Sequence, residues 1–205
     1  MKVVLVNGSP KPNGCTYTGL SIIKEQLAKQ GVDSEIFQVG AKPIIGCTAC
    51  VKCRTLGKCV FDDDGVNRVA EAMATADGLV LGSPVHYAGA SGALTSFADR
   101  LFYSMDKKNL RLKFGASIVS CRRGGATAAF DQLNKYFTIS QMPLVPSNYW
   151  NQIHGHTPEE VMKDEEGLQT LRVLANNMAY LIKCAAQSNV PLPEEEPKIT
   201  TNFIR

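Results

Sequence analysis

Four cysteines lie within thirteen residues of this 205-residue chain, and their type and spacing could do redox or metal chemistry. Thiolates three residues apart can surround an iron–sulfur cube, which takes four cysteine ligands. Zinc is also bound by four cysteines, although such ligands more often come as two separated pairs. Free or redox-active thiols are the third interpretation, and the spacing alone leaves all three open. The four residues are Cys47, Cys50, Cys53 and Cys59.

A second segment suited to chemistry, residues 7–16, follows the apolar run at 3–6. It is rich in glycine and hydroxyl residues, and a helical pattern comes directly after it. A loop of this kind places backbone N–H groups, hydroxyls and the positive end of a helix around one point, which suits a phosphate. The alternative is an ordinary turn in which Ser9 or Thr16 only caps the helix. We therefore expect residues 7–16 to hold a phosphate.

Two further glycine-rich loops, at 83–92 and 120–126, also follow apolar runs. Their chemistry suits a flavin, because Tyr87 could stack on its ring system and glycines let backbone N–H groups approach its polar edge. Arg122 and Arg123 supply positive charge, either to a reduced flavin or to the phosphate of a nicotinamide cofactor. The expected binding residues are Pro84, Val85, His86, Tyr87, Ala88, Gly89, Ser120, Arg122, Arg123, Gly124 and Gly125.

The elements that must position these loops alternate five times between strand and helix, which predicts one doubly wound α/β domain. Five parallel strands in the order 2-1-3-4-5 would bring the three loops together at their carboxyl ends. We expect this domain to span residues 1–187, with a cysteine-rich insertion at 43–61 and an extended tail at 188–205. Asp62, Asp63 and Asp64 should cap a helix through Val66, in preference to binding a divalent cation. The expected strands lie at 3–6, 34–39, 79–82, 114–120 and 142–145.

The composition is that of an ordinary globular chain, with 44% hydrophobic and 20% charged residues. A net charge of +3 without long like-charge runs gives no reason to expect a nucleic-acid partner. The apolar stretches are too short to span a membrane, and the N-terminus carries no signal-peptide pattern. We therefore expect a cytoplasmic protein whose thiols stay reduced, rather than one held together by disulfides.

Loop 7–16 resembles the Gly-Ser-Pro-(x)n-Gly-x-Thr loop of flavodoxin-like NAD(P)H-dependent FMN reductases, which holds the FMN phosphate. The resemblance implies that the phosphate is held by the residues at the matching positions, Ser9, Lys11, Cys15 and Thr16. The run Ser83-Pro84-Val85-x-Tyr87, followed by Gly92-Ala93-Leu94 and Asp99-Arg100, is similar to the family's second FMN-binding segment. Arg123-Gly124-Gly125 resembles its third. The cysteine spacing is similar to that of iron–sulfur flavoproteins, a branch of this fold that carries FMN and a [4Fe–4S] cluster.

This resemblance implies a flavodoxin-like, FMN-dependent oxidoreductase that takes electrons from NAD(P)H and passes them to a small acceptor such as a flavin or a quinone. The alternatives are an electron carrier that works with a ferredoxin-like partner, and a flavoprotein that senses redox state. Flavin N5 would carry the chemistry, so no residue is assigned as catalytic; His86, Tyr87 and Arg123 are the candidates for a direct role. The family also implies a homodimer or a homotetramer.

Overall fold

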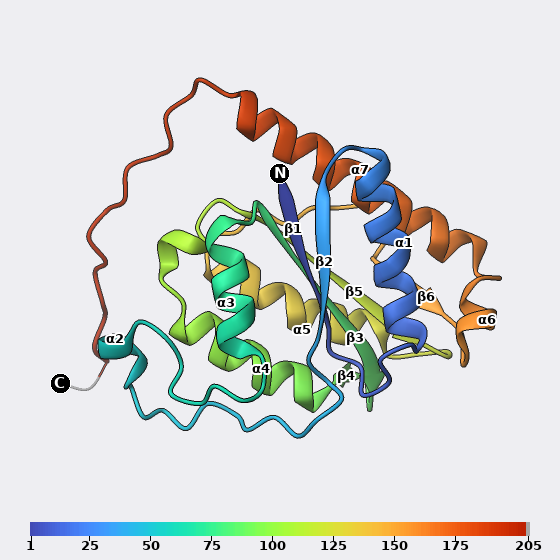
Figure 1. Ribbon diagram of the computed structural model, residues 1–205, viewed down its shortest axis with the longest axis horizontal. Coiled ribbons are helices and arrows are strands. Elements are labelled where there is room, and N and C mark those ends of the chain that lie inside the picture. Colours follow the sequence, from blue (N-terminus) through green and yellow to red (C-terminus); the bar gives the residue numbers. More distant parts are fainter. Residues whose placement is uncertain (204–205) are drawn as a thin grey trace.

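The computed structural model describes residues 1–203 and shows a parallel sheet with helices on both faces (Figure 1). The sheet order is β2-β1-β3-β5-β6, so the predicted doubly wound α/β fold is confirmed. A two-residue strand, β4 (Gly89–Ala90), pairs antiparallel with β3 in addition. The parallel strands are β1 (Lys2–Asn7), β2 (Asp33–Gln38), β3 (Gly78–His86), β5 (Phe114–Cys121) and β6 (Gln152–His154).

The continuous apolar run of β1 is explained by the helices that cover both faces of the sheet. Val3 and Leu5 pack into the core on one side, and Val4 and Val6 pack into the core on the other side. A strand buried on both faces needs apolar residues at every position, because successive side chains point to opposite faces.

Each face of the sheet has its own set of helices. The core on the face that carries Val3 and Leu5, the first core, lies between the sheet and the N-terminal and C-terminal helices, which also contact each other. The second core lies under three central helices. The first pair is α1 (Cys15–Lys29) and α7 (Glu165–Gln187), and the second group is α3 (Val66–Thr75), α4 (Gly92–Ser104) and α5 (Ala126–Ile139).

The position predicted for the fifth strand is wrong. Residues 142–145 contribute one isolated parallel bridge, between Gly115 and Leu144, and the fifth parallel strand is β6. The apolar residues that suggested a strand, Met142 and Val145, are buried in the core without forming a ladder. A pattern of apolar residues indicates that a segment is buried, but a short buried segment need not form a ladder of hydrogen bonds with a neighbouring strand.

The predicted cap of α3 is also wrong in position. Gly65 is the N-cap residue, with a φ of 87°, and the first turn of the helix contains no acidic residue. Asp64 Oδ1 accepts a 3.4 Å hydrogen bond from Val66 N, but the Asp64 carboxylate also pairs with Arg100 of α4. The aspartates therefore precede the helix instead of forming its first turn.

The remaining segments are short or extended. The connection between β2 and α3 holds the cysteines and one helical turn, α2 (Cys53–Leu56), while α6 (Pro158–Val161) follows β6. Beyond α7 the described residues form an extended tail, fastened where Arg111 Nη2 donates a 2.7 Å hydrogen bond to Pro193 O. None of the helices within residues 1–203 combines the length and the apolar character that crossing a bilayer requires.

Candidate functional site

The loop after β1 is held in a fixed shape by its own polar groups. Ser9 N donates to Asn7 Oδ1 at 3.2 Å, and Lys11 N donates to Ser9 Oγ at 3.1 Å. Gln38, at the end of β2, donates from Nε2 to Ser9 O at 2.7 Å. The loop is therefore tied to the carboxyl ends of two neighbouring strands, where parallel sheets place their ligands.

The N-terminus of α1 opens directly onto this loop. Its N-cap residue is Gly14, which makes no side-chain cap, so the interpretation that Ser9 or Thr16 caps the helix is wrong. Instead, the Thr16 and Ser120 hydroxyls, both buried, form a 2.8 Å hydrogen bond that joins this loop to the end of β5. The first-turn N–H groups and the helix dipole are thus available to an anion.

A cavity of about 300 Å³ lies at these strand ends. All four residues expected to hold a phosphate line it, together with residues of both other glycine-rich loops. The structure therefore brings together three loops whose lining residues extend from Ser9 to Arg122 along the chain. The predicted residues in its walls are Ser9, Lys11, Cys15, Thr16, Pro84, Val85, His86, Ser120 and Arg122.

The tip of the second loop lies outside the walls of this cavity. Tyr87 and Ala88 form the turn of the β3–β4 hairpin with φ angles of 50° and 60°, and the Tyr87 side chain is fully exposed. Two successive left-handed residues match the primed turns that join tight hairpins, and they are strained for non-glycine residues. Tyr87 is therefore displayed to solvent rather than stacked within the described cavity.

The other predicted residues outside the walls belong to the turns that lead from these loops. Gly125, with a φ of 88°, is the N-cap of α5, and a Cβ there would come within 2.8 Å of Ala88 Cα. This close approach explains the glycine at position 125 without a ligand. Gly89 begins β4, whereas Arg123 and Gly124 are exposed beside Arg122.

Sequence reasoning missed the fourth wall of the cavity, residues 155–158, which run from the end of β6 to the first residue of α6. Cys15 Sγ contacts Gly155 O at 3.6 Å, and Thr157 caps α6 through Glu160 N. Residues 155–158 carry no distinctive motif. Because the fifth strand was predicted at 142–145, these residues were not expected at the end of a strand. The alternation in β6, where one apolar residue, Ile153, lies between two polar ones, was the only signal that could have located them.

The charges around the cavity suit an anionic ligand. Lys11 and Arg122 are exposed at its rim, and the N-terminus of α1 adds a partial positive charge. Burial raises the pKa of the Cys15 and Cys121 thiols, so both stay neutral and serve as small apolar parts of the wall. Chemically, the cavity can bind a phosphorylated organic molecule, with its phosphate at loop 7–16.

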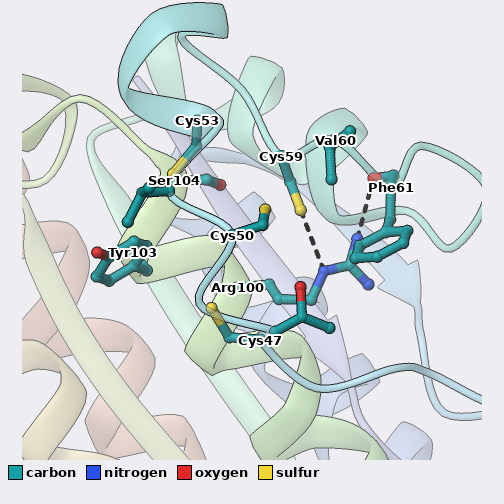
Figure 2. Close-up of a pocket in the computed structure, with 11 residues that line it drawn as sticks. Cys47, Cys50, Cys53, Cys59, Val60, Phe61, Arg100, Tyr103 and Ser104 are labelled. Carbon is teal, nitrogen blue, oxygen red and sulfur yellow. Dashed lines mark hydrogen bonds between the residues drawn. The ribbon is translucent and has the colours of Figure 1, made fainter.

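The four clustered cysteines surround a second, much smaller cavity of about 20 Å³ (Figure 2). Cys47 and Cys50 are exposed, Cys53 is half-buried and Cys59 is buried. Hydrogen bonding from Lys52 N lowers the pKa of the exposed Cys50 thiol, which favours its thiolate. Within residues 1–203, no three histidine, cysteine or acidic side chains converge closely enough to hold a single metal ion.

Arg100 of α4 connects this pocket to the core, so this residue of the Asp99-Arg100 pair lies at the cysteines and not in the wall of the strand-end cavity. Its side chain is 1% exposed, and Nε donates to Cys59 Sγ at 3.2 Å. The two terminal nitrogens donate to both oxygens of Asp64, to Ile45 O at 3.3 Å and to Phe61 O at 2.9 Å. All five N–H groups of the guanidinium therefore have an acceptor.

The electrostatics of this buried pair favour its charged form. Desolvation lowers the pKa of the Arg100 guanidinium, but the hydrogen bonds to Asp64 and Cys59 outweigh it, so that the net pKa is raised. A bidentate guanidinium–carboxylate pair is a strong, charge-assisted interaction with fixed geometry. Arg100 consequently holds the cysteine segment at positions before Cys47 and after Cys59.

Known proteins resemble this chain in sequence over most of its length. Residues 1–157 match the family model of NADPH-dependent FMN reductase. An iron–sulfur flavoprotein of Methanocaldococcus jannaschii is 32% identical over 190 residues, covering 89% of this chain and 98% of the relative.

Two solved structures show the same fold at low sequence identity. RosB, solved with a bound 8-demethyl-8-formylriboflavin-5′-phosphate intermediate, has a TM-score of 0.73 and 15% identity over 100% of this chain and 94% of its own. A flavodoxin from the domain Archaea has a TM-score of 0.61 and 18% identity, over 89% of this chain and 99% of its own. The flavodoxin-like fold expected from the sequence is thereby confirmed.

The ion pair of Arg100 yields a prediction about stability. Replacing Asp64 with alanine should lower the free energy of unfolding by about 3–5 kcal/mol, because it leaves a buried guanidinium without its counter-charge. Asp63→Ala is the matched control: the residue is exposed, and its loss should change stability by less than about 0.5 kcal/mol. Urea unfolding of both variants measures the difference, and equal stabilities would contradict a structural role for the pair.

Proposed function

The chain belongs to the NADPH-dependent FMN reductase family, and we propose that it is an FMN-dependent oxidoreductase with an iron–sulfur cluster as its second redox centre. The observation that carries this proposal is the presence of two separate cavities in one fold. One is a strand-end cavity built around a phosphate-type loop, and the other is bounded by all four clustered cysteines. The curated relative from Methanocaldococcus jannaschii, an iron–sulfur flavoprotein, supports the pairing of these two groups.

The residues of loop 7–16 fit the phosphate of FMN. The hydroxyls of Ser9 and Thr16 lie in the walls of the cavity, and Lys11 stands at its rim. The N-terminus of α1 lies at the same place, since Gly14, Cys15 and Thr16 line the cavity, and no side chain caps its first-turn N–H groups. These groups would bind the phosphate through hydrogen bonds and charge, with no need for a metal.

The other walls fit a flavin ring. Pro84, Val85 and His86 provide a mainly apolar edge on one side, and Ser120 and Arg122 provide polar groups on the other. Bound FMN would supply the transfer of a hydride or of single electrons. Arg122 would place positive charge near the ring, which stabilises a reduced, anionic flavin.

The four cysteines of the pocket are the number and type of ligand that an iron–sulfur cube requires. A cube with four irons binds each cysteine through a different iron, so its four thiolates must surround a volume instead of meeting at one point. Cys47, Cys50, Cys53 and Cys59 do surround one pocket, and Arg100 Nε already donates to the Cys59 sulfur. Hydrogen bonds to ligand sulfurs are a regular part of such sites.

We propose NAD(P)H as the electron donor and a small electrophile as the acceptor. Two observations support this donor. The family model that the chain matches is that of an NADPH-dependent reductase. In addition, Arg122 is exposed at the cavity and can pair with a nicotinamide cofactor's phosphate. A second candidate function is electron transfer with a ferredoxin-like partner through the cysteine pocket. It is favoured by exposed cations beside the cysteines, which would attract an acidic protein: Lys52, Arg54 and Lys58.

The phosphate assignment predicts that Thr16→Glu abolishes retention of FMN. A carboxylate beside the phosphate should weaken FMN binding at least about a hundredfold, because opposed like charges cost several kcal/mol. Thr138→Glu introduces the same charge at an exposed position near the end of α5 and should leave FMN bound. Flavin absorbance per chain in the purified proteins measures the result, and stoichiometric FMN in the Thr16 variant would refute the assignment.

The cluster assignment predicts that Cys50→Ser loses iron but retains FMN. Removing one of four ligands should reduce the iron content from about four atoms per chain to near zero. Cys184→Ser, which changes another exposed cysteine on α7, should keep full iron content. Both proteins are purified without oxygen and analysed for iron, sulfide and flavin; equal iron contents would count against these ligands.

The choice of electron donor can be tested at Arg122. In Arg122→Ala the NADPH concentration that gives half-maximal flavin reduction should rise about tenfold or more, because a charge-assisted hydrogen bond is worth about 1.5–3 kcal/mol. Its neighbour Arg123 lies outside the described cavity wall, so Arg123→Ala should react at the wild-type rate. Stopped-flow bleaching of the flavin measures both. A wild-type flavin that reduced ferredoxin bleaches and NADPH does not would favour the second candidate function.

A further inference from the structure

Two polar residues of α4 face the cysteine pocket from the core side. Arg100 and Ser104 are one helical turn apart, so they lie on the same face of the helix. Both line the pocket with the four cysteines, and Figure 2 shows Arg100 between Cys59 and Cys47 and Ser104 next to Cys53. Neither residue lines the cavity at the strand ends. Their chemistry therefore concerns the cysteine pocket alone.

Arg100 is committed to this pocket by its hydrogen bonds. Four of its N–H groups hold Asp64 and two backbone carbonyls, and the fifth, at Nε, is directed at the Cys59 sulfur. The guanidinium also lies over the Phe61 ring, 5.1 Å from its centroid. With every donor engaged and 1% of its surface exposed, the guanidinium has little freedom to turn away from the sulfur.

Ser104 presents the opposite situation. Its side chain is 8% exposed, and its hydroxyl is buried without a hydrogen-bond partner among residues 1–203. An unsatisfied buried hydroxyl is destabilising, so it needs an explanation in terms of structure or function. In Figure 2 the Ser104 side chain faces the same pocket as the Cys53 sulfur. A group bound in that pocket could accept its hydrogen bond.

We propose that Arg100 and Ser104 are the hydrogen-bond donors that position the iron–sulfur cluster and set its reduction potential. Arg100 acts through Nε at the Cys59 sulfur, and Ser104 donates from its hydroxyl to a cysteine or sulfide sulfur on the Cys53 side. This inference rests on the proposed function, because it requires that the cysteines hold a cluster. Reduction adds negative charge to the sulfurs and strengthens both hydrogen bonds, so the two donors raise the potential.

The test compares cluster midpoint potentials in wild-type protein and three serine variants, by redox titration followed by electron paramagnetic resonance. Ser104→Ala should change the oxidised-to-reduced ratio at a given potential about tenfold, a fall of about 59 mV for a one-electron couple. Ser104→Thr keeps the hydroxyl and should retain the wild-type potential. Ser96→Ala removes a hydroxyl from the same helix outside the pocket and should leave the potential unchanged.

The FMN potential, read in the same titration, serves as the internal reference and should be equal in all four proteins. Arg100→Lys tests the other donor: it keeps the positive charge but lacks the Nε donor, and it should also lower the cluster potential. If that variant does not fold, the Ser104 series decides the question.

The outcomes separate this inference from the proposed function. A full complement of iron with the same potential in wild type and Ser104→Ala would overturn the role of Ser104 while leaving the cluster assignment intact. Wild-type protein that contains FMN but takes up no iron would overturn the cluster assignment and this inference together. A potential that falls equally in Ser96→Ala would also overturn it, because the effect would then not come from the pocket.

Discussion

The arrangement of the cysteine segment depends on one buried charge. Arg100 comes from the core-facing side of α4, where water cannot solvate a guanidinium, so the chain must provide acceptors for all its donors. It does so with Asp64, with the backbone on both sides of the cysteines and with Cys59. A segment with a single helical turn of its own thereby gains a defined shape. The hydrogen bonds that satisfy the guanidinium are therefore the same ones that hold the segment carrying the four thiols.

The parallel sheet supplies the second constraint. Its strands run in the same direction, so the loops after β1, β3 and β5 and the cysteine segment after β2 all begin at the same edge of the sheet (Figure 1). The cavity for a phosphorylated ligand forms where β1 and β3 diverge to opposite neighbours, as it does in other doubly wound folds. Both proposed redox groups therefore depend on one topological feature.

Much of this could be predicted because the patterns are local. The apolar run of β1 indicated a strand buried on both faces, and loop 7–16 with residues 83–86 indicated where a ligand would lie. The wall at 155–158 could not be predicted, because β6 is three residues long and its neighbours carry no motif. The role of Arg100 was equally hidden, since its acceptors lie 36 to 55 residues earlier in the chain. Tyr87 shows that a residue in the right loop can still be exposed to solvent outside the cavity wall. The oligomeric state and the cytoplasmic location stay predictions from the sequence.

The central claim, that one chain carries both FMN and an iron–sulfur cluster, is tested most directly by the absorption spectrum of protein purified without oxygen, read together with its iron, sulfide and flavin contents. The account predicts a flavin spectrum with a broad iron–sulfur shoulder, and about four irons and one FMN per chain. A flavin spectrum without iron, in protein whose cysteines titrate as free thiols, would contradict it and leave a simple FMN reductase.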